Sequence, residues 1–484
     1  MITISEENHI ENNQKERLGD QIQTWAMSSL DIITRVVIIF GLIALIAAEV
    51  VLLSKGEINF GVAIACLPFG ILGLLLLIGH FEYASAAILF SAAFIPFSLP
   101  TGRGSPIVAS LLLSMGLVGL WVLRMMLIEK KITLKSSPVN LPTIGFVAIT
   151  MVSLAWSNIF RDPSVSVPNI FIFVQLGAAG VMVMSPVVSL LVGNTITNGR
   201  QLKIIAVIMM LIGLIGLVEN FLNINLYTVI GGLTSLWVVA LAVSFTFFDQ
   251  TMSKLIKIGL MVMAGLWVLW NLVLNLNWYA GWLPGIVALA VIAFFRSKRL
   301  LIVFTVLVLA YIAINYTIIA QNISFKQVND GATRMDAWLV NWNVTSQHLF
   351  FGTGPAGYAA YYMALDPNRA MATHNNYIDI ISEIGVTGLV LYLWLFGAFV
   401  WQGYRVVKRL KGRKDFYEAL GISAFAGLIG CIVIMAFGDW LIPFAYTQTI
   451  AGYNYTVYSW IFMGTILALD NLIKENGILD KKNG

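Results

Sequence analysis

Charged residues are scarce in this sequence: Asp, Glu, Lys and Arg make up only 11% of its 484 residues, whereas 59% are hydrophobic. A water-soluble protein could not bury so much apolar surface, so this composition excludes that class and indicates a polytopic membrane protein. The net charge of +5 gives no sign of a nucleic-acid partner. Its distribution among the loops is informative instead, because it reports membrane orientation.

Metal-binding and redox motifs are missing as well. The two cysteines, Cys66 and Cys431, lie in apolar runs and are too few for a disulfide framework, so we interpret them as small core residues. The sequence contains no D-x-D of a metal-bound nucleotide-sugar site, no H-E-x-x-H and no Cys/His cluster. We therefore expect no metal and no other cofactor. The polar first 25 residues also lack the apolar core of a cleavable secretory signal.

Apolar stretches long enough to cross about 30 Å of hydrocarbon recur along the chain. They predict an all-α polytopic membrane protein with about 12–14 transmembrane helices and one larger helical loop outside the membrane. The expected helices are 30–53, 60–79, 83–99, 106–128, 140–159, 168–192, 203–222, 228–248, 255–276, 279–296, 300–320, 376–402, 417–439 and 452–471.

The positive-inside rule orients these helices with both termini in the cytoplasm. Most of the 29 Lys and Arg then fall on the inner side, including the cluster RVVKRLKGRK, and the outer side holds only Lys55, Arg103, Arg161, Lys326, Arg334 and Arg369. No other orientation places as many Lys and Arg on the inner side. The expected organisation is a cytoplasmic tail at 1–28, helices 1–11 within 29–320, an extracytoplasmic loop with amphipathic helices at 321–375, helices 12–14 within 376–471 and a cytoplasmic tail at 472–484.

The 321–375 loop is the only long connection between the expected helices, which is typical of a functional segment. It contains FFGTGPAGY, whose glycines have the G-x-G-x-x-G spacing of a dinucleotide-binding loop: Gly352, Gly354 and Gly357. However, the loop faces outward, no βαβ unit surrounds the motif, and Pro355 interrupts the expected helix start. We therefore interpret the glycines as a tight turn between two surface helices.

An amphipathic helix is expected before this turn. Thr333 can cap it, with Asp336 as the capping-box partner. Arg334 stands in its first turn, where the helix dipole disfavours a cation unless an anionic ligand binds there. A solvated surface arginine is the alternative. The face that suits a membrane interface carries Met335, Trp338, Leu339 and Trp342.

His374 precedes the next expected membrane helix, in the segment ATHNNYIDIISEIGVTGLVLYL. Thr373, Asn375 or Asn376 can cap that helix, which places His374 at its positive end. The helix dipole disfavours the imidazolium and keeps the ring neutral near physiological pH, as a general base requires. The alternative is a histidine that only hydrogen-bonds the backbone.

Arginines dominate the few outward cations, and their planar donor forks suit phosphate oxygens. They favour an anionic ligand such as a diphosphate beside the bilayer, although Arg161 has a local pair with Asp162 as an alternative explanation.

Carboxylates within a membrane are costly and therefore functional candidates. Glu219 and Asp439 lie near outer helix ends, and Glu383 lies one to two turns into a helix, where it can alternatively pair with an arginine and only hold the fold.

The order TRMDAW, QHLFFGTGPAGY and THNNYIDIISEIGVTGLVLYL resembles the signature block of the O-antigen ligase and O-antigen polymerase superfamily. The segment SLAWSNIFRDPSVSVPNIFIFV is similar to the "WS…DP" region of that superfamily. Members often carry a Ser-Arg-Gly element before the large loop, but here that region reads NLNWYAGWLPG. The missing charge would then come from Arg103, Arg161 or Arg369, or the substrate contact differs.

This resemblance implies a membrane glycosyltransferase of the bacterial inner membrane. A glycan would move en bloc, with inversion and without a metal, from a polyprenyl (undecaprenyl) diphosphate carrier to an acceptor hydroxyl on the extracytoplasmic side. The acceptor would be a glycan, a lipid or a cell-wall molecule, so ligase and polymerase both remain open. The resemblance implies that Arg334 contacts the diphosphate and that His374 is the base or a positioning residue, so both are expected to be catalytic. From the residues themselves we further expect diphosphate binding by Arg369, Arg103 and Arg161, and support by Asn375, Glu383 and Glu219.

Two other classes of function predict different features of the sequence. A lipid-linked oligosaccharide flippase would show two related halves with broken helices at matching positions, and we find no such internal repeat. A non-catalytic assembly partner of a cell-envelope machine would have no specific need for Arg334 or His374. We therefore expect the glycosyltransferase.

Overall fold

The computed structural model describes residues 79–99, 106–226, 228, 230–276, 279–318, 320, 332–365, 373–445 and 448–475. The chain divides into two compact units, Met1–Phe81 and Glu82–Gly484, and the fold below is that of the second unit. The expected helix 30–53 and nearly all of the expected helix 60–79 lie outside the described residues.

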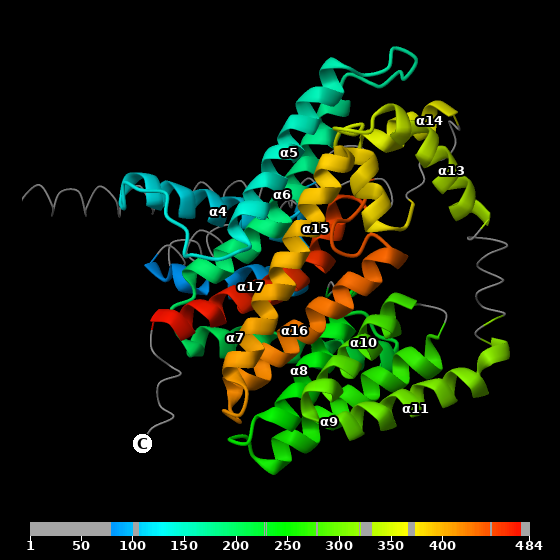
Figure 1. Cartoon of the computed structure of the whole chain (residues 1–484). Helices are drawn as coiled ribbons and strands as arrows, with labels where there is room; N and C mark the ends of the chain where they lie inside the picture. Colours follow the sequence, from blue (N-terminus) through cyan, green and yellow to red (C-terminus); the bar gives the residue numbers. More distant parts are fainter. Residues whose placement is uncertain are drawn as a thin grey trace, which may run out of the picture. The chain divides into compact units, whose positions relative to one another are not determined.

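The described residues fold almost entirely into helices (Figure 1). The helices before residue 320 are α3 (Ala84–Phe94), α4 (Ala109–Leu127), α5 (Asn140–Ile159), α6 (Phe171–Thr195), α7 (Gly199–Leu222), α8 (Thr234–Phe248), α9 (Lys254–Leu269), α10 (Tyr279–Arg296) and α11 (Lys298–Ile314). Those after it are α13 (Ala332–Gln347), α14 (Gly357–Leu365), α15 (Asn376–Leu410), α16 (Phe416–Ile434) and α17 (Tyr453–Glu475). Short helical turns are η1 (Phe81–Tyr83), the π-helix η2 (Trp270–Leu274), η4 (Met435–Phe437) and η5 (Ile450–Gly452).

The only strands among the described residues form a small antiparallel ribbon. β1 (Ser98–Leu99) pairs with β2 (Ile107–Val108), so that Ser98 faces Val108. Eight helices of the described residues are long and apolar enough to cross a membrane. The protein is therefore an all-helical polytopic membrane protein, as its composition indicates, because helices satisfy their own backbone hydrogen bonds in lipid.

Helix α17 lies at the centre of the helical packing. All residues in its most apolar stretch are buried, whereas only 22% of the residues in the corresponding stretch of the span formed by α9 and η2 are buried. It packs closely on α6 because Gly464 leaves room for Val192: a Cβ at residue 464 would lie 2.6 Å from the Val192 Cβ. The Asn471 side chain also donates to the Gly193 carbonyl, at 2.8 Å. Small residues and polar side chains of this kind are what hold helices together in lipid.

Helix α15 is broken near its N-terminus. Gly385 has a φ of +75°, so a short segment, 376–384, is followed by a long one, 386–410. The Phe350 carbonyl fills the space beside Gly385, since a Cβ there would lie 2.2 Å from that oxygen. The sequence predicted a single helix, which was wrong: the break lets another part of the chain approach the backbone, and it puts Glu383 at the end of the first segment.

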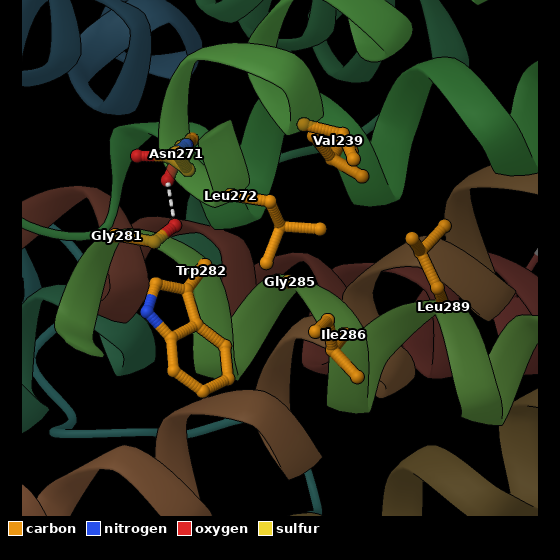
Figure 2. A pocket seen from close by; sticks show the side chains of 10 residues that line it. Val239, Asn271, Leu272, Gly281, Trp282, Gly285, Ile286 and Leu289 are labelled. Atoms are coloured by element: carbon orange, nitrogen blue, oxygen red, sulfur yellow. Dashed lines mark hydrogen bonds between the residues drawn. The ribbon is translucent and has the colours of Figure 1, made fainter. Parts of the chain in front are cut away.

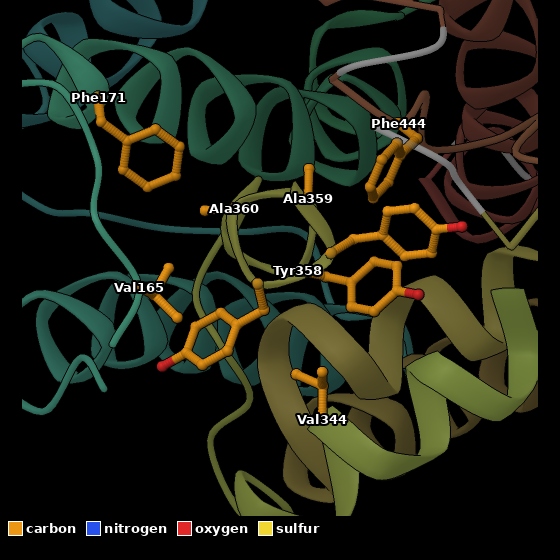
Figure 3. Packing of buried hydrophobic residues seen from close by; sticks show 9 residues of the cluster. Val165, Phe171, Val344, Tyr358, Ala359, Ala360 and Phe444 are labelled. Carbon is orange, nitrogen blue, oxygen red and sulfur yellow. The ribbon is translucent and has the colours of Figure 1, made fainter. Parts of the chain in front are cut away.

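Residues 357–362 of helix α14 are buried in a cluster of aromatic and small side chains (Figure 3). The cluster consists of Val165, Phe171, Val344, Tyr358, Ala359, Ala360, Tyr361, Tyr362 and Phe444. By contrast, α13 exposes Trp338, Leu339 and Trp342, the interfacial face expected for it. The expectation of two surface helices is therefore correct for α13 and wrong for α14, whose apolar residues pack against α6, α13 and the segment before α17.

Candidate active site

The glycine-rich turn connects α13 to α14 and packs against the break in α15. Gly352 and Gly354 have φ values of +69° and +87°. The Gly354 N–H donates to the Glu383 carbonyl at 2.8 Å, and a Cβ on Gly352 would lie 2.4 Å from the same carbonyl group. The glycines therefore allow close approach between two backbones. A helix precedes the turn, whereas a dinucleotide-binding loop follows a strand.

His374 stands immediately before the cap of α15. Asn375 is the N-cap, and its side chain accepts from the N–H groups of Tyr377 (3.0 Å) and Ile378 (3.3 Å). His374 thus occupies the positive end of the helix, as the sequence predicts. Its φ of +52° is in the left-handed region. Such a conformation costs a residue other than glycine about 1–3 kcal/mol and persists where neighbouring contacts impose it, often at functional sites.

The carboxylate that faces His374 belongs to Asp439. Its Oδ1 lies 3.7 Å from the His374 Nδ1, within ion-pair range and longer than a hydrogen bond. The Phe444 N–H donates to the other oxygen of Asp439 at 3.2 Å. Asp439 is 2% exposed, whereas the His374 side chain is 35% exposed. The imidazole therefore has a buried carboxylate beside its Nδ1 and is itself partly exposed.

Asn376 joins α15 to the segment that carries Asp439. Its side-chain amide donates to the Ile442 carbonyl at 2.7 Å, and its Oδ1 accepts from the Leu441 N–H at 3.0 Å. The segment 438–445, which carries Asp439, is thereby fixed to the first turn of α15. Asn375 adds a bond from its side-chain amide to the Ala436 carbonyl, at 3.1 Å.

Two further carboxyl groups lie one helical turn apart in α15. Asp379 and Glu383 are 5% and 3% exposed. Thr373 donates to the Asp379 Oδ1 through its backbone N–H (3.2 Å) and its hydroxyl (2.6 Å). One oxygen of each carboxyl group, Asp379 Oδ2 and Glu383 Oε1, has no partner among the described residues. Sequence reasoning selected Glu383 but missed Asp379, whose only signal is an acid in the first turn of a helix.

The arginines expected to bind an anion are only partly described. Arg334 lies in the first turn of α13, as expected, but its side chain is outside the described part of the chain. Arg103 and Arg369 lie outside the described residues altogether. Among these four arginines, the structure describes one side chain, that of Arg161.

Arg161 lies in the loop between α5 and α6. Its Nη2 donates to the Asn158 Oδ1 (3.0 Å) and the Gln175 Oε1 (3.4 Å), and its guanidinium lies 5.2 Å from the centre of the Phe171 ring. No ion pair with Asp162 occurs in the described region. The Asp162 carboxylate instead accepts from the Ser164 N–H at 2.8 Å, and this bond lowers the pKa of Asp162 below its ordinary value. The expected alternative of a local pair is thus not observed.

The loop that carries Arg161 is fixed to α14. The Asp162 N–H donates to the Tyr361 hydroxyl at 3.1 Å, and the His348 ring packs edge-on against Tyr361 at 4.8 Å between centroids. Burial lowers the pKa of His348 and raises that of Tyr361. Gln175 accepts from Arg161 and also lies beside the turn, because a Cβ added at Gly354 would be 2.9 Å from the Gln175 Nε2. The structure therefore brings Arg161 close to the glycine-rich turn.

Glu219 has a local partner set. Its carboxylate accepts from the Thr228 hydroxyl at 2.7 Å and from the Leu226 N–H at 2.9 Å. These bonds stabilise the turn that follows α7. The described contacts of Glu219 do not include His374 or Asp439.

A separate small cavity lies between α8, η2 and α10 (Figure 2). Its volume is about 20 Å³, and its polar wall consists of Asn271 and Ser235. The Ser235 hydroxyl donates to the Gly281 carbonyl at 2.9 Å. Among the described residues, no group of three or more His, Cys, Asp or Glu is arranged to hold a metal ion. None of the residues that line this cavity is titratable.

A family model described as O-antigen ligase matches residues 237–393. The match runs from α8 into α15 and includes the glycine-rich turn, His374 and Asp379. No curated protein matches the chain. The match confirms the resemblance found in the sequence, and the matched family is one of ligase- and polymerase-type membrane glycosyltransferases.

Proposed function

We propose that this multi-pass membrane protein, with its O-antigen ligase region at 237–393, transfers a glycan from a polyprenyl diphosphate carrier to an acceptor hydroxyl. The donor lies with its polyprenyl chain in the bilayer and its glycan at the His374 end of α15. We place that end on the extracytoplasmic side of a bacterial inner membrane and both chain termini in the cytoplasm, on the evidence of the Lys and Arg distribution. The acceptor is another glycan or a different cell-envelope molecule.

The observation that carries this proposal is the environment of His374. A partly exposed imidazole in a strained backbone conformation stands at a helix N-terminus, and a buried carboxylate faces its Nδ1 at 3.7 Å. A base and an orienting carboxylate in this order recur where a hydroxyl must lose a proton. The arrangement lies within the matched region except for Asp439.

The reaction requires one proton transfer and one displacement. His374 Nε2 takes the proton of the acceptor hydroxyl, and the acceptor oxygen attacks the anomeric carbon of the donor from the face opposite the diphosphate. The bond from that carbon to the diphosphate oxygen breaks, and the diphosphate leaves with the electron pair. Arginine guanidinium groups, Arg334 first, stabilise the charge on the leaving diphosphate. Because the leaving group is already activated and cations surround it, the proposal includes no metal.

Reconstituted protein tests this function directly. Wild-type protein in liposomes that contain purified lipid-linked glycan should transfer the glycan to an added acceptor, and a chelator should leave the rate unchanged. His374→Asn should lower turnover about 10²–10⁴-fold, the usual contribution of a positioned base. Asparagine suits this position because it tolerates left-handed backbone, so the fold is preserved.

His80→Asn is the matched control, since it removes a histidine outside the matched region. It should keep wild-type turnover. Wild-type turnover in His374→Asn would refute the base assignment. Donor that crosses the bilayer without transfer would indicate the flippase instead.

A further inference from the structure

We propose that Asp379 and Trp338 are positioning residues that act through Thr373 to hold the His374 imidazole against Asp439. The inference rests on the proposed function, because it specifies how the base of that reaction is held. Neither residue needs to touch substrate for this role. The two side chains come from different helices, α15 and α13, and they meet at the peptide that precedes His374.

Thr373 is fully buried, and its hydrogen-bonding groups are all in use. Its backbone N–H and hydroxyl both donate to the Asp379 Oδ1, at 3.2 and 2.6 Å. Its carbonyl accepts from the Trp338 indole N–H at 2.8 Å. The peptide groups on both sides of Thr373 are therefore fixed, one by each helix. Both bonds go to one oxygen of Asp379, so α15 holds the backbone and the side chain of Thr373 together.

The residues after His374 are fixed as well. Asn375 is held by its capping bonds and by the Ala436 carbonyl, and Asn376 is held by the segment 438–445. His374 is thus the single residue between two anchored stretches. A left-handed φ is disfavoured for an L-residue in a free chain, so these anchors help to hold His374 in it. Because the same segment 438–445 carries Asp439, the anchors also set the distance between the imidazole and that carboxylate.

Trp338 gives this arrangement a second consequence. It lies one helical turn after Arg334 in α13, so its bond to Thr373 fixes α13 relative to His374. The helix that carries the expected diphosphate-binding arginine is therefore kept in register with the base. A shift of about 1 Å between such groups is enough to lower the rate of a reaction about 100-fold.

Conservative variants of Thr373 and Trp338 separate positioning from simple packing. Thr373→Val keeps the side-chain volume but removes the hydroxyl bond, and Trp338→Phe keeps an aromatic ring but removes the indole donor. Each should lower kcat about 10- to 100-fold, and Thr373→Val should leave KM for the lipid-linked donor unchanged, because Thr373 does not bind substrate. Thr373→Ser restores the hydroxyl and should keep a near wild-type kcat.

A second measurement does not depend on glycan transfer. In a parent variant with His9, His80 and His348 replaced by Asn, the ¹⁵N spectrum of the remaining imidazole reports only His374. The parent should give one narrow set of resonances, and Thr373→Val in that parent should give broadened or multiple sets. Narrow resonances in Thr373→Val, like those of the parent, would overturn the positioning role. If wild-type protein transfers no glycan, the spectra still decide this role, and only the proposed function fails.

Discussion

At the scale of single residues, the two histidines of the region between α13 and α15 that the structure describes have different environments. His374 is partly exposed and faces a buried carboxylate, whereas His348 packs edge-on against the Tyr361 ring. Burial is the main influence on His348 and lowers its pKa, and the nearby Asp162 only partly opposes this. The neutral form of His348 is thus the one that the folded protein favours.

This environment predicts an acid-sensitive contribution of His348 to stability. Because its folded-state pKa lies below the unfolded value of 6.5, the unfolded chain binds more protons as the pH falls. The contribution of His348 is therefore fully present above pH 6.5 and is lost below it. Thermal unfolding in detergent between neutral and mildly acidic pH should show a smaller loss of Tm for His348→Gln than for wild type. An equal loss in both proteins would contradict the assigned cause.

The sequence predicted some site residues and could not predict others. His374 was identifiable because a histidine beside three possible helix caps stands out in an apolar region. Asp439 was noticed as a carboxylate near a helix end, but its position opposite His374 depends on how the segment 438–445 packs on α15. Asp379 was missed because an acid in a first helical turn is ordinary. These pairings arise from tertiary contacts between distant segments, which hydropathy does not report.

At the scale of elements, long apolar runs determine most of the expected helices, but the expected helix 83–99 was wrong beyond Phe94, because Ser98–Leu99 pairs with Ile107–Val108 as a two-stranded ribbon. The ranges 140–159 and 279–296 coincide with α5 and α10. The break in α15 was not predicted, since a glycine within an apolar run is tolerated in many membrane helices. Its effect becomes visible only when the Phe350 carbonyl is seen beside Gly385. The burial of α14 was missed for a similar reason, because nine apolar residues can lie at an interface or inside a core.

Two glycines of α15 allow a matched test of the break. Gly385→Ala introduces a side chain at a φ of +75° and 2.2 Å from the Phe350 carbonyl, so it should lower the free energy of unfolding by more than about 2 kcal/mol. Gly397→Ala is the control, because nothing lies within 4 Å of its added Cβ. It should be neutral or slightly stabilising, since alanine favours a helix by up to about 1 kcal/mol. Denaturant unfolding measures the free energy of unfolding of both variants. Equal losses in the two variants would exclude the close approach at Gly385.

At the scale of the whole molecule, the two ends of α15 have different roles. Its long segment after the break, 386–410, is by itself longer than the hydrocarbon thickness of about 30 Å at about 1.5 Å per residue. His374 precedes the first residue of the helix, whereas Arg409, in its last turn, pairs with the buried Asp470 of α17 at 2.9 Å. Lys474 and Gln402 also donate to Asp470, at 2.7 and 3.1 Å. This second end has a structural role, because its polar groups satisfy one another.

Asp470→Asn tests that division of roles. The change removes a buried charge that two cations share, while Arg409 and Lys474 keep part of their exposure to water. We expect a loss of about 1–3 kcal/mol in the free energy of unfolding, with unchanged transfer activity at a temperature where the protein is folded. Glu129→Gln removes an exposed pair with Arg124 and should cost less than about 1 kcal/mol. A loss of transfer without a loss of stability in Asp470→Asn would contradict the structural role.

A structure of the His374→Asn protein with its lipid-linked donor bound, in a lipid nanodisc, tests the central claim most directly. The account predicts that the donor's anomeric carbon lies beside residue 374, near the segment that carries Asp439, and that the diphosphate contacts Arg334. Donor bound at the Arg409 end of α15, or held with its diphosphate away from both residues 334 and 374, would contradict it.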